Sequence, residues 1–250
     1  MLTIFLLCLA GFGAALVDSI AGGGGLISVP AFLAAGVPPH LALGTNKFAA
    51  TAGSLTSSIR YARSAKVHWG LLKYLMPATL IGAVIGVHTV LQINRRLLNA
   101  LVLALILIVG VYSLFSRTLG AEDRFRGINP GNVPAGMALA LFLGFYDGFF
   151  GPGTGSFLMF GLIMIYGFDF LHSGGNARVL NFISNITSLA LFIYFRKVDY
   201  FLGVPVALAM AAGAQVGSKL ALTKGAKVVK PVFITIALAV AAKMLWGLRG

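Results

Sequence analysis

The chain has 250 residues, of which 58% are hydrophobic and 10% are charged. Soluble domains average about 25% charged residues, so this composition excludes an ordinary soluble domain, and its apolar content excludes a disordered chain. Cys8 is the single cysteine, which excludes a disulfide scaffold. The net charge of +13 would suggest nucleic acid in a soluble protein, but here the basic residues lie between apolar stretches. That pattern is typical of the positive-inside anchoring of a polytopic membrane protein, so no nucleic-acid partner is expected.

Apolar runs of roughly 16–24 residues can cross a bilayer core about 30 Å thick. In chain order they lie at about 2–17, 41–61, 69–91, 97–115, 132–150, 172–195, 200–218 and 231–247. Two shorter apolar pieces, at about 25–36 and 155–167, follow glycine-rich stretches and are expected to be half-helices or re-entrant segments. The first run lacks the basic start of a signal peptide, so we expect it to stay in the mature protein. The predicted fold class is therefore all-α, with about eight transmembrane helices.

The two halves of the chain match in several blocks at offsets of 129 to 131 residues. The matched blocks are Asp18 to Gly25 with Asp147 to Gly155, Lys66 to Trp69 with Lys197 to Tyr200, and Gly82 to Gly86 with Gly213 to Gly217. We predict two four-span repeats, 1–115 and 132–250, joined by the polar loop 116–131, with breaks at 22–25 and 151–155. With Lys47 and Arg178 set aside, the other 17 basic residues divide 11 to 6 for parallel and for inverted repeats, so charge leaves that choice open.

Asp18 and Asp147 occupy matching positions, each after an apolar stretch and before a glycine cluster. Placing Asp in the hydrocarbon core costs about 2.5–3.5 kcal/mol on insertion scales, so each carboxylate needs a partner, a water-filled cavity or a proton. One interpretation is proton coupling or gating. The other is that each carboxylate caps the amides of the following half-helix. The two roles are compatible.

The glycine-rich breaks are the second candidate element, because unwound backbone at membrane depth requires burial in protein or a polar cavity. Half-helices that begin there would direct amide groups and the positive end of a helix dipole toward that cavity, which favours anion binding. Close helix packing is the alternative, and it explains Gly82 and Gly86 better than it explains the Pro152 break. The predicted substrate-binding residues of the breaks are Gly22, Gly23, Gly24, Gly25, Gly151, Gly153, Thr154 and Gly155.

The third element places an amide and a cation near the start of a span in each half, as Asn46-Lys47 and Asn176-Ala177-Arg178. These side chains either snorkel to the interface or converge on the central site and neutralise an oxyanion, with Arg178 as a planar fork and Lys47 as a point charge. Further along the same helices, Thr56, Asn181 and Asn185 could form a polar track together with nearby serines, although Ser and Thr more often bond to their own helix.

Sites for metals, nucleotides or enzymatic catalysis are not expected. The histidines have no metal-ligand spacing, no Gly-Lys-Ser/Thr follows the glycines, and the acids and histidines form no pair spaced like a catalytic dyad. We therefore predict no cofactor, no metal and no enzymatic activity, and the absence of an ATP motif disfavours a primary pump.

The run Asp18-Ser-Ile-Ala-Gly-Gly-Gly-Gly-Leu-Ile-Ser-Val-Pro30, followed by Ala42-Leu-Gly-Thr-Asn-Lys47, resembles the sulfite exporter TauE/SafE family, in particular its YfcA-like members. The second-half motifs Gly144-Phe-Tyr-Asp147 to Gly155 and Asn176-Ala-Arg178-Val-Leu-Asn181 are similar too. The likeness covers nearly the whole chain except the central loop. It implies a bacterial inner-membrane transporter of about eight spans for sulfur-containing or related organic anions, often an exporter. It also implies substrate binding at the glycine breaks and at the Asn-Lys and Asn-Ala-Arg positions.

The sequence thus predicts a secondary transporter of a small anion, with a site near the bilayer midplane between the repeats and alternating access by motion of one repeat against the other. A sulfur-containing substrate is favoured, and proton coupling through Asp18 and Asp147 is expected. An uncoupled anion channel and a transporter of a non-sulfur organic anion are the alternatives, while a membrane enzyme or a scaffold subunit would not explain two matched polar breaks. The expected partners are the anion and the lipid bilayer, and a homo-oligomer is left open.

Overall fold

The computed structural model describes residues 1–94, 97–98 and 123–224. This part of the chain is helical and contains no strand. In chain order the helices are α1 (Leu2–Ala21), α2 (Gly25–Ala34), α3 (Pro39–Arg63), α4 (Trp69–Gln92), α6 (Val133–Phe149), α7 (Thr154–Tyr166), α8 (Phe170–Tyr194) and α9 (Tyr200–Lys224).

Four of these helices, α1, α4, α8 and α9, are long and apolar enough to cross a membrane. The predicted span at 41–61 corresponds to α3, which has 25 residues but carries Lys47 and a run of hydroxyl side chains. The span predicted at 132–150 corresponds to α6, which has 17 residues. The spans predicted at 97–115 and 231–247 fall, except for 97–98, outside the described residues. Of the six expected spans that lie within the described residues, four therefore satisfy length and apolarity together.

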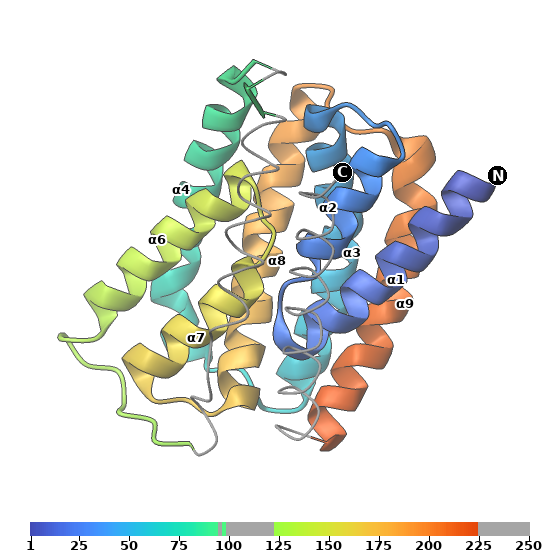
Figure 1. Cartoon of the computed structure of the whole chain (residues 1–250). Coiled ribbons are helices and arrows are strands. Elements are labelled where there is room, and N and C mark those ends of the chain that lie inside the picture. Colours follow the sequence, from blue (N-terminus) through green and yellow to red (C-terminus); the bar gives the residue numbers. More distant parts are fainter. Residues whose placement is uncertain (95–96, 99–122, 225–250) are drawn as a thin grey trace, which may run out of the picture.

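Both glycine-rich stretches end one helix and reverse the chain into the next. Gly22, Gly151 and Gly153 have φ angles of 82°, 98° and 87°, which side chains with a Cβ rarely adopt. Figure 1 shows that the α1–α2 and α6–α7 hairpins open toward opposite ends of the molecule and that their tips meet near its middle. The predicted half-helices at 25–36 and 155–167 correspond to α2 and α7.

Helices at matching positions in the two halves run in opposite directions. In Figure 1, α3 descends and α8 ascends, whereas α4 ascends and α9 descends. The His68 amide, which follows α3, donates to Asn176 Oδ1 at the start of α8 over 2.9 Å. Reciprocally, the Asp199 amide, which follows α8, donates to Thr45 Oγ1 at the start of α3 over 2.9 Å. These two contacts make α3 and α8 antiparallel neighbours.

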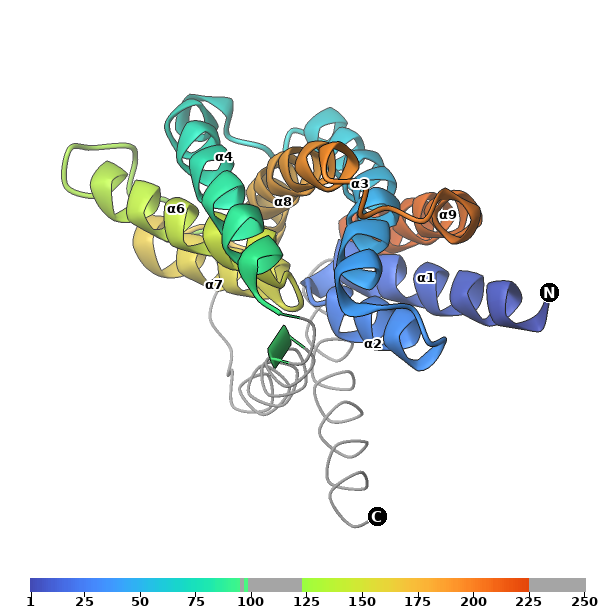
Figure 2. The ribbon, with the colours of Figure 1, turned by 90° about the horizontal axis from the view of Figure 1, so that it is seen from above.

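The helices pack as two groups, and each group combines helices from both halves of the chain. One group contains α1, α2, α3 and α9, the other contains α4, α6, α7 and α8, and α3 packs against α8 between them (Figure 2). Glycines create the closest approaches within each group. Gly82 and Gly86 of α4 lie on the backbone of α6, and Gly213 and Gly217 of α9 lie on the backbone of α1. Small residues at this spacing are what lets membrane helices approach so closely.

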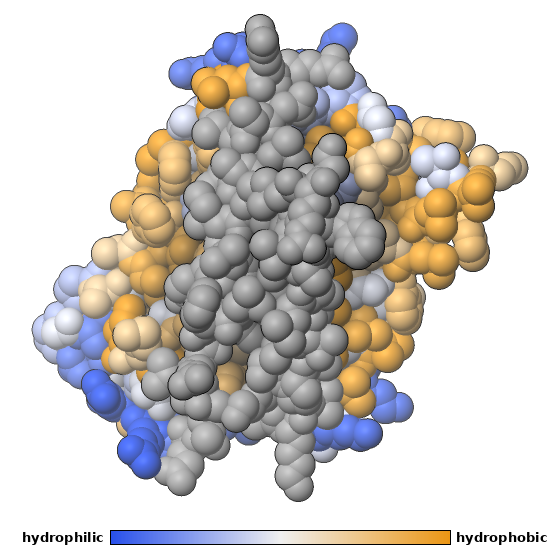
Figure 3. Space-filling model, viewed as in Figure 1, coloured by the Kyte–Doolittle hydropathy of each residue, from blue (hydrophilic) through white to orange (hydrophobic). Residues whose placement is uncertain are grey.

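The surface between the two ends of the molecule is apolar. In Figure 3, orange flanks on either side lie between blue ends. Large exposed side chains of α1, α4, α6 and α9 contribute to this belt, among them Phe5, Ile81, Phe142, Phe201 and Leu208. Such an extensive exposed apolar surface is what a lipid-facing protein presents.

Glycine packing can be tested by adding one methyl group in α9. A Cβ at Gly217 would overlap the Leu16 carbonyl oxygen of α1. We expect Gly217→Ala to lower the free energy of unfolding by roughly 1–3 kcal/mol, because neither backbone can yield without moving its helix. Thermal unfolding of the detergent-solubilised protein measures this.

The matched control is Gly13→Ala, because a Cβ at Gly13 meets nothing within 4 Å. It should leave the melting temperature unchanged or raise it slightly, since Ala favours a helix over Gly by about 1 kcal/mol. Equal melting temperatures for the two variants would contradict the packing assigned to α1 and α9.

Candidate functional site

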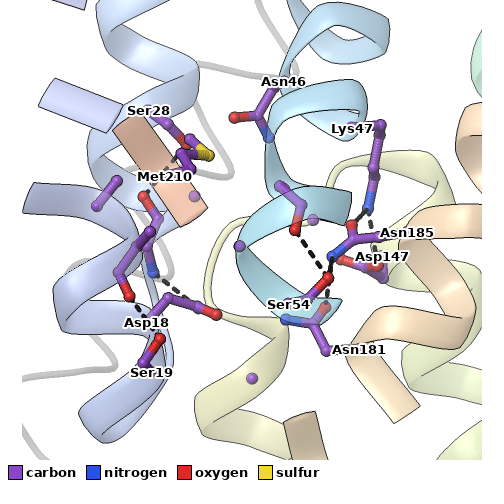
Figure 4. Close-up of a pocket in the computed structure, with 18 of the residues that line it drawn as sticks. Asp18, Ser19, Ser28, Asn46, Lys47, Ser54, Asp147, Asn181, Asn185 and Met210 are labelled. Carbon is purple, nitrogen blue, oxygen red and sulfur yellow. Dashed lines mark hydrogen bonds and ion pairs between the residues drawn. The ribbon is translucent and has the colours of Figure 1, made fainter. Parts of the chain in front are cut away.

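A polar cavity lies where the two hairpin tips meet the middle of α3 and α8. Figure 4 shows Asp18 on one side of it and Lys47, Asp147 and Asn185 on the other. The polar side chains that line it are Asp18, Ser19, Ser28, Asn46, Lys47, Ser54, Asp147, Asn181 and Asn185. The space open to the centre of a water molecule is about 40 Å³, compared with the roughly 10–15 Å³ that one water needs. The cavity can therefore hold several waters or a small ion.

Lys47 and Asp147 form a buried ion pair across the cavity wall. Lys47 Nζ from α3 lies 2.7 Å from Asp147 Oδ2 of α6, and the two side chains are only 4% and 3% exposed. Lys47 also donates to Asn185 Oδ1 over 3.0 Å, and the Ser184 hydroxyl donates to the same Asp147 oxygen. Since a buried charge without a partner is costly, this network offsets the cost of burying both groups away from water.

Arg178 and Asp18 form the second ion pair. Arg178 Nη1 of α8 lies 3.0 Å from Asp18 Oδ2 of α1, with the arginine side chain fully buried and the aspartate side chain 21% exposed. The other oxygen of Asp18 accepts the Gly24 amide over 3.1 Å, so this carboxylate also caps the start of α2. Nε and Nη2 of Arg178 are buried without a hydrogen-bond partner. The guanidinium thus has spare donors for water or another oxygen acceptor.

The two ion pairs cross between the helix groups. Lys47 of α3 reaches α6 in the other group, and Arg178 of α8 reaches α1. Each pair therefore joins a cation of one half of the sequence to the carboxylate of the other half. The four side chains together carry no net charge when all are ionised.

The glycine breaks supply backbone to the cavity and hold the two hairpin tips together. Gly24, Gly25, Gly151, Gly153 and Gly155 line it. The Ser156 hydroxyl at the start of α7 donates to the Ala21 carbonyl oxygen over 2.9 Å and so links the tips. A Cβ at Gly22 would overlap the backbone of this same serine, so Gly22 serves the tip contact and does not line the cavity.

The predicted polar track is divided by the structure. Asn181, Asn185 and Ser54 line the cavity, and Asn185 Nδ2 donates to Ser54 Oγ over 3.4 Å. Thr56 instead donates to the Ala52 carbonyl oxygen of its own helix over 2.8 Å and does not line the cavity. Of the predicted polar track, Asn181 and Asn185 of α8 therefore reach the cavity and Thr56 of α3 does not.

Several predicted binding residues lie outside the cavity lining. Asn176 accepts the His68 amide and donates to the His172 carbonyl oxygen over 2.7 Å, so its amide joins a loop to α8. Thr154 donates to the Gly151 carbonyl oxygen over 2.7 Å and fixes the α6–α7 turn. Gly23 and Arg178 do not line the cavity either, although Arg178 contacts Asp18, which does. Asn176 therefore does not enter the site proposed below.

Ser19, Ser28 and Met210 are among the cavity residues that were not singled out from the sequence. Ser19 and Ser28 flank the first break, and a search for hydroxyls beside the glycines could have found them. Met210 lies in α9 with no polar neighbour in sequence, so no local signal identifies it.

One group of potential metal ligands occurs in the described part of the chain, away from the cavity. Donor atoms of Asp123, Asp169 and His172 lie within 4.8 Å of one another. His172 Nδ1 is 2.9 Å from Asp169 and 3.5 Å from Asp123, and the Asp169 carboxylate also caps α8 by accepting the His172 amide. The expectation that the histidines lack metal-ligand spacing missed this group, because Asp123 is brought to the start of α8 only by the fold.

Comparison with known proteins places the chain among membrane transporters. The family model described as sulfite exporter TauE/SafE matches residues 7–244. A "Probable membrane transporter protein" of Haemophilus influenzae is 36% identical over 94% of this chain and 92% of its own length. A second such protein, from a Sinorhizobium species, is 38% identical over 96% and 91% of the two chains. The "Probable membrane transporter protein YfcA" of Escherichia coli K12 is 36% identical over 98% and 89%. No solved structure matches the chain significantly.

A double-mutant cycle tests the buried Lys47–Asp147 pair. We expect Lys47→Met alone to lower the free energy of unfolding by about 3–5 kcal/mol, because it leaves a buried carboxylate unpaired. The double variant Lys47→Met, Asp147→Leu should recover most of that loss, because no charge then remains to be compensated. Unfolding of the detergent-solubilised variants measures both quantities.

Lys73→Met is the control, since Lys73 is an exposed lysine of α4. Its effect should stay within about 0.5 kcal/mol. Additive losses in the cycle would show that the two side chains are not coupled.

Proposed function

The chain belongs to the sulfite exporter TauE/SafE family of membrane transporters, and from this premise we propose that it is a secondary transporter of a small anion. The anion binds in the cavity between the hairpin tips. The observation that carries the proposal is the meeting of a buried lysine, unwound glycine backbone and hydrogen-bonding amides in one small space. An integral membrane protein retains such a polar space where it serves a solute.

Anion binding is supported by the donors around the cavity. Lys47 has three N–H donors, two of which go to Asp147 and Asn185. The third is available to an anion in the cavity that Lys47 lines. Behind the Asp18 carboxylate, Arg178 keeps two unpaired donors, which add positive potential. The glycines let an oxyanion approach the backbone closely.

A sulfur-containing oxyanion is the favoured substrate class. The family description refers to sulfite, and the cavity of about 40 Å³ suits an anion with few heavy atoms, such as sulfite or thiosulfate, or the head of a sulfonate. A non-sulfur organic anion of the same size is the alternative, and it would use the same donors.

Alternating access between two inverted repeats fits the arrangement of the helices. Matching helices run in opposite directions, and the contacts of Thr45 with Asp199 and of Asn176 with His68 are reciprocal, as a two-fold relation would produce. Because α4 packs with the second half and α9 with the first, we propose that the moving units are the two packed groups. This replaces the simpler idea that one sequence repeat moves against the other.

We infer an orientation from the basic residues that the described part of the chain places at the two ends of the molecule. Arg60, Arg63, Lys66, Lys73, Arg124, Arg126, Lys219 and Lys224 lie at the lower end in Figure 1, where α3 and α9 end and α4 begins. Arg196 and Lys197 lie in the loop after α8 at the upper end. By the positive-inside rule the lower end faces the cytoplasm of a bacterial inner membrane that the chain crosses several times.

Flux into proteoliposomes tests this function. We expect saturable uptake of at least one of sulfite, thiosulfate and sulfoacetate, little uptake of a carboxylate control, and arrest when a pH gradient is collapsed. Flux that does not saturate and is indifferent to the gradient would instead indicate an uncoupled channel. No uptake of any anion would contradict the proposed function.

The variant Lys47→Ala, Arg178→Ala should reduce uptake by at least about 30-fold, because removing a buried charge from a polar contact costs roughly 2–5 kcal/mol. Lys73→Ala is the control and should transport normally, because this lysine is exposed on α4. The variants are compared at equal amounts of monodisperse protein. Normal transport by a well-folded double variant would remove Lys47 and Arg178 from the site.

A further inference from the structure

We propose that the two ion pairs, Lys47–Asp147 and Arg178–Asp18, make transport electroneutral. Each negative charge of the anion then enters the site with one proton, which Asp147 or Asp18 holds. The inference rests on the proposed function and adds the stoichiometry of coupling to it. The number of protons equals the number of negative charges on the anion minus the net charge of the four side chains Asp18, Lys47, Asp147 and Arg178.

For the residues that the structure describes, the net charge around the cavity is zero. Lys47, Asp147 and Arg178 are the fully buried charged side chains in the described part of the chain. Asp18 lines the same cavity and completes the second ion pair. An anion that joins these four groups alone would leave its own charge uncompensated in a space that holds only a few water molecules.

An uncompensated charge in such a space is unfavourable by several kcal/mol even after relaxation. A proton on one carboxylate compensates the negative charge of the anion and also releases the cation that was paired with that carboxylate. If Asp147 takes the proton, Lys47 loses its anionic partner at a distance of 2.7 Å and faces the cavity that it lines. The arriving anion then replaces the carboxylate as the partner of the lysine.

Among the described residues, the groups facing Asp147 offer no other compensating charge. From α3 it meets Lys47, and from α8 it meets the Ser184 hydroxyl. Lys73 and His88 of α4 are exposed. On its own helix the Tyr146 hydroxyl donates to the Pro152 carbonyl oxygen, and on α7 the Tyr166 hydroxyl donates to the Asn132 carbonyl oxygen.

Asp18 is likewise paired with one cation, although it is more exposed than Asp147. Arg178 of α8 is its ion-pair partner, and Lys47 of α3 faces the same cavity. The Tyr61 hydroxyl of α3 donates to the Ser19 carbonyl oxygen. The charged residues described in α9, Lys219 and Lys224, are exposed at the far end of that helix. A divalent anion would therefore use both carboxylates, one proton on each.

The test uses the full chain in proteoliposomes and measures steady-state accumulation of methanesulfonate as a monovalent probe and thiosulfate as a divalent one. A potassium gradient with valinomycin sets the membrane potential at equal pH, and in separate vesicles a pH gradient is set at zero potential. Electroneutral transport predicts no response to potential. It predicts about 10-fold accumulation per pH unit for the monovalent anion and about 100-fold for the divalent one.

Transport of a monovalent anion without a proton would respond to potential by about 50-fold per 100 mV and not to pH. That result for the wild-type protein would overturn the inference and the proton coupling, while leaving binding and transport of an anion by this protein intact. If neither probe is accumulated, sulfite serves as the probe, with its protonation at each pH included in the count of protons. Failure of all three probes contradicts the proposed function itself.

Two variants test the charge count. Asp147→Asn and Asp18→Asn each give the site a net charge of +1, so each should carry the monovalent anion with one proton fewer. Its accumulation should lose the 10-fold response to pH and gain the 50-fold response to potential. Asp123→Asn, at an exposed aspartate away from the cavity, is the control and should keep the wild-type response. Unchanged coupling in both cavity variants would overturn the inference, and the wild-type measurement decides it if neither variant folds.

Discussion

Four charged side chains in a lipid-embedded core require one another. Burying Lys47 or Arg178 without a carboxylate within about 3 Å would be costly, and so would removing the cation from either carboxylate. Each pair connects the two groups of helices, so charge as well as apolar packing fixes their relative position. Apolar packing alone discriminates poorly, because helices make equally good apolar contacts with lipid tails. Because both pairs join the same two groups of helices, the four charges at the centre of the molecule act together.

The breaks in the helices follow from that requirement. Asp18 lies in the last turn of α1 and Asp147 in the last turn of α6, so a carboxylate reaches the centre only because its helix stops there. Glycines with positive φ reverse the chain within a few residues. The freed backbone is then satisfied locally, as when Asp18 accepts the Gly24 amide and Ser156 donates to Ala21. The helix breaks therefore bring the carboxylates to the centre, and polar side chains there satisfy the unwound backbone.

Sequence patterns predicted the features that depend on neighbours along the chain. The half-helices were placed within a few residues, because apolar length and glycine clusters are local signals. The pairing of Asp18 with Arg178 could not be predicted, since the partners are 160 residues apart and the choice depends on inverted packing. At the offset of 131 residues Asn176 matches Thr45, and the structure gives these two residues reciprocal contacts with loop amides.

The two ion pairs are similar in charge and unequal in surroundings. Asp18 is 21% exposed and is bound to both an arginine and a helix-capping amide. Asp147 is 3% exposed, and its oxygen is shared by Lys47 and Ser184. Lys47 borders the cavity directly, whereas Arg178 stands behind Asp18. An anion in the cavity therefore competes with a carboxylate for the lysine but acts on the arginine only through Asp18. In the proposed cycle Lys47 therefore exchanges its carboxylate partner for the anion. The Arg178–Asp18 pair stays in place meanwhile and keeps α2 positioned.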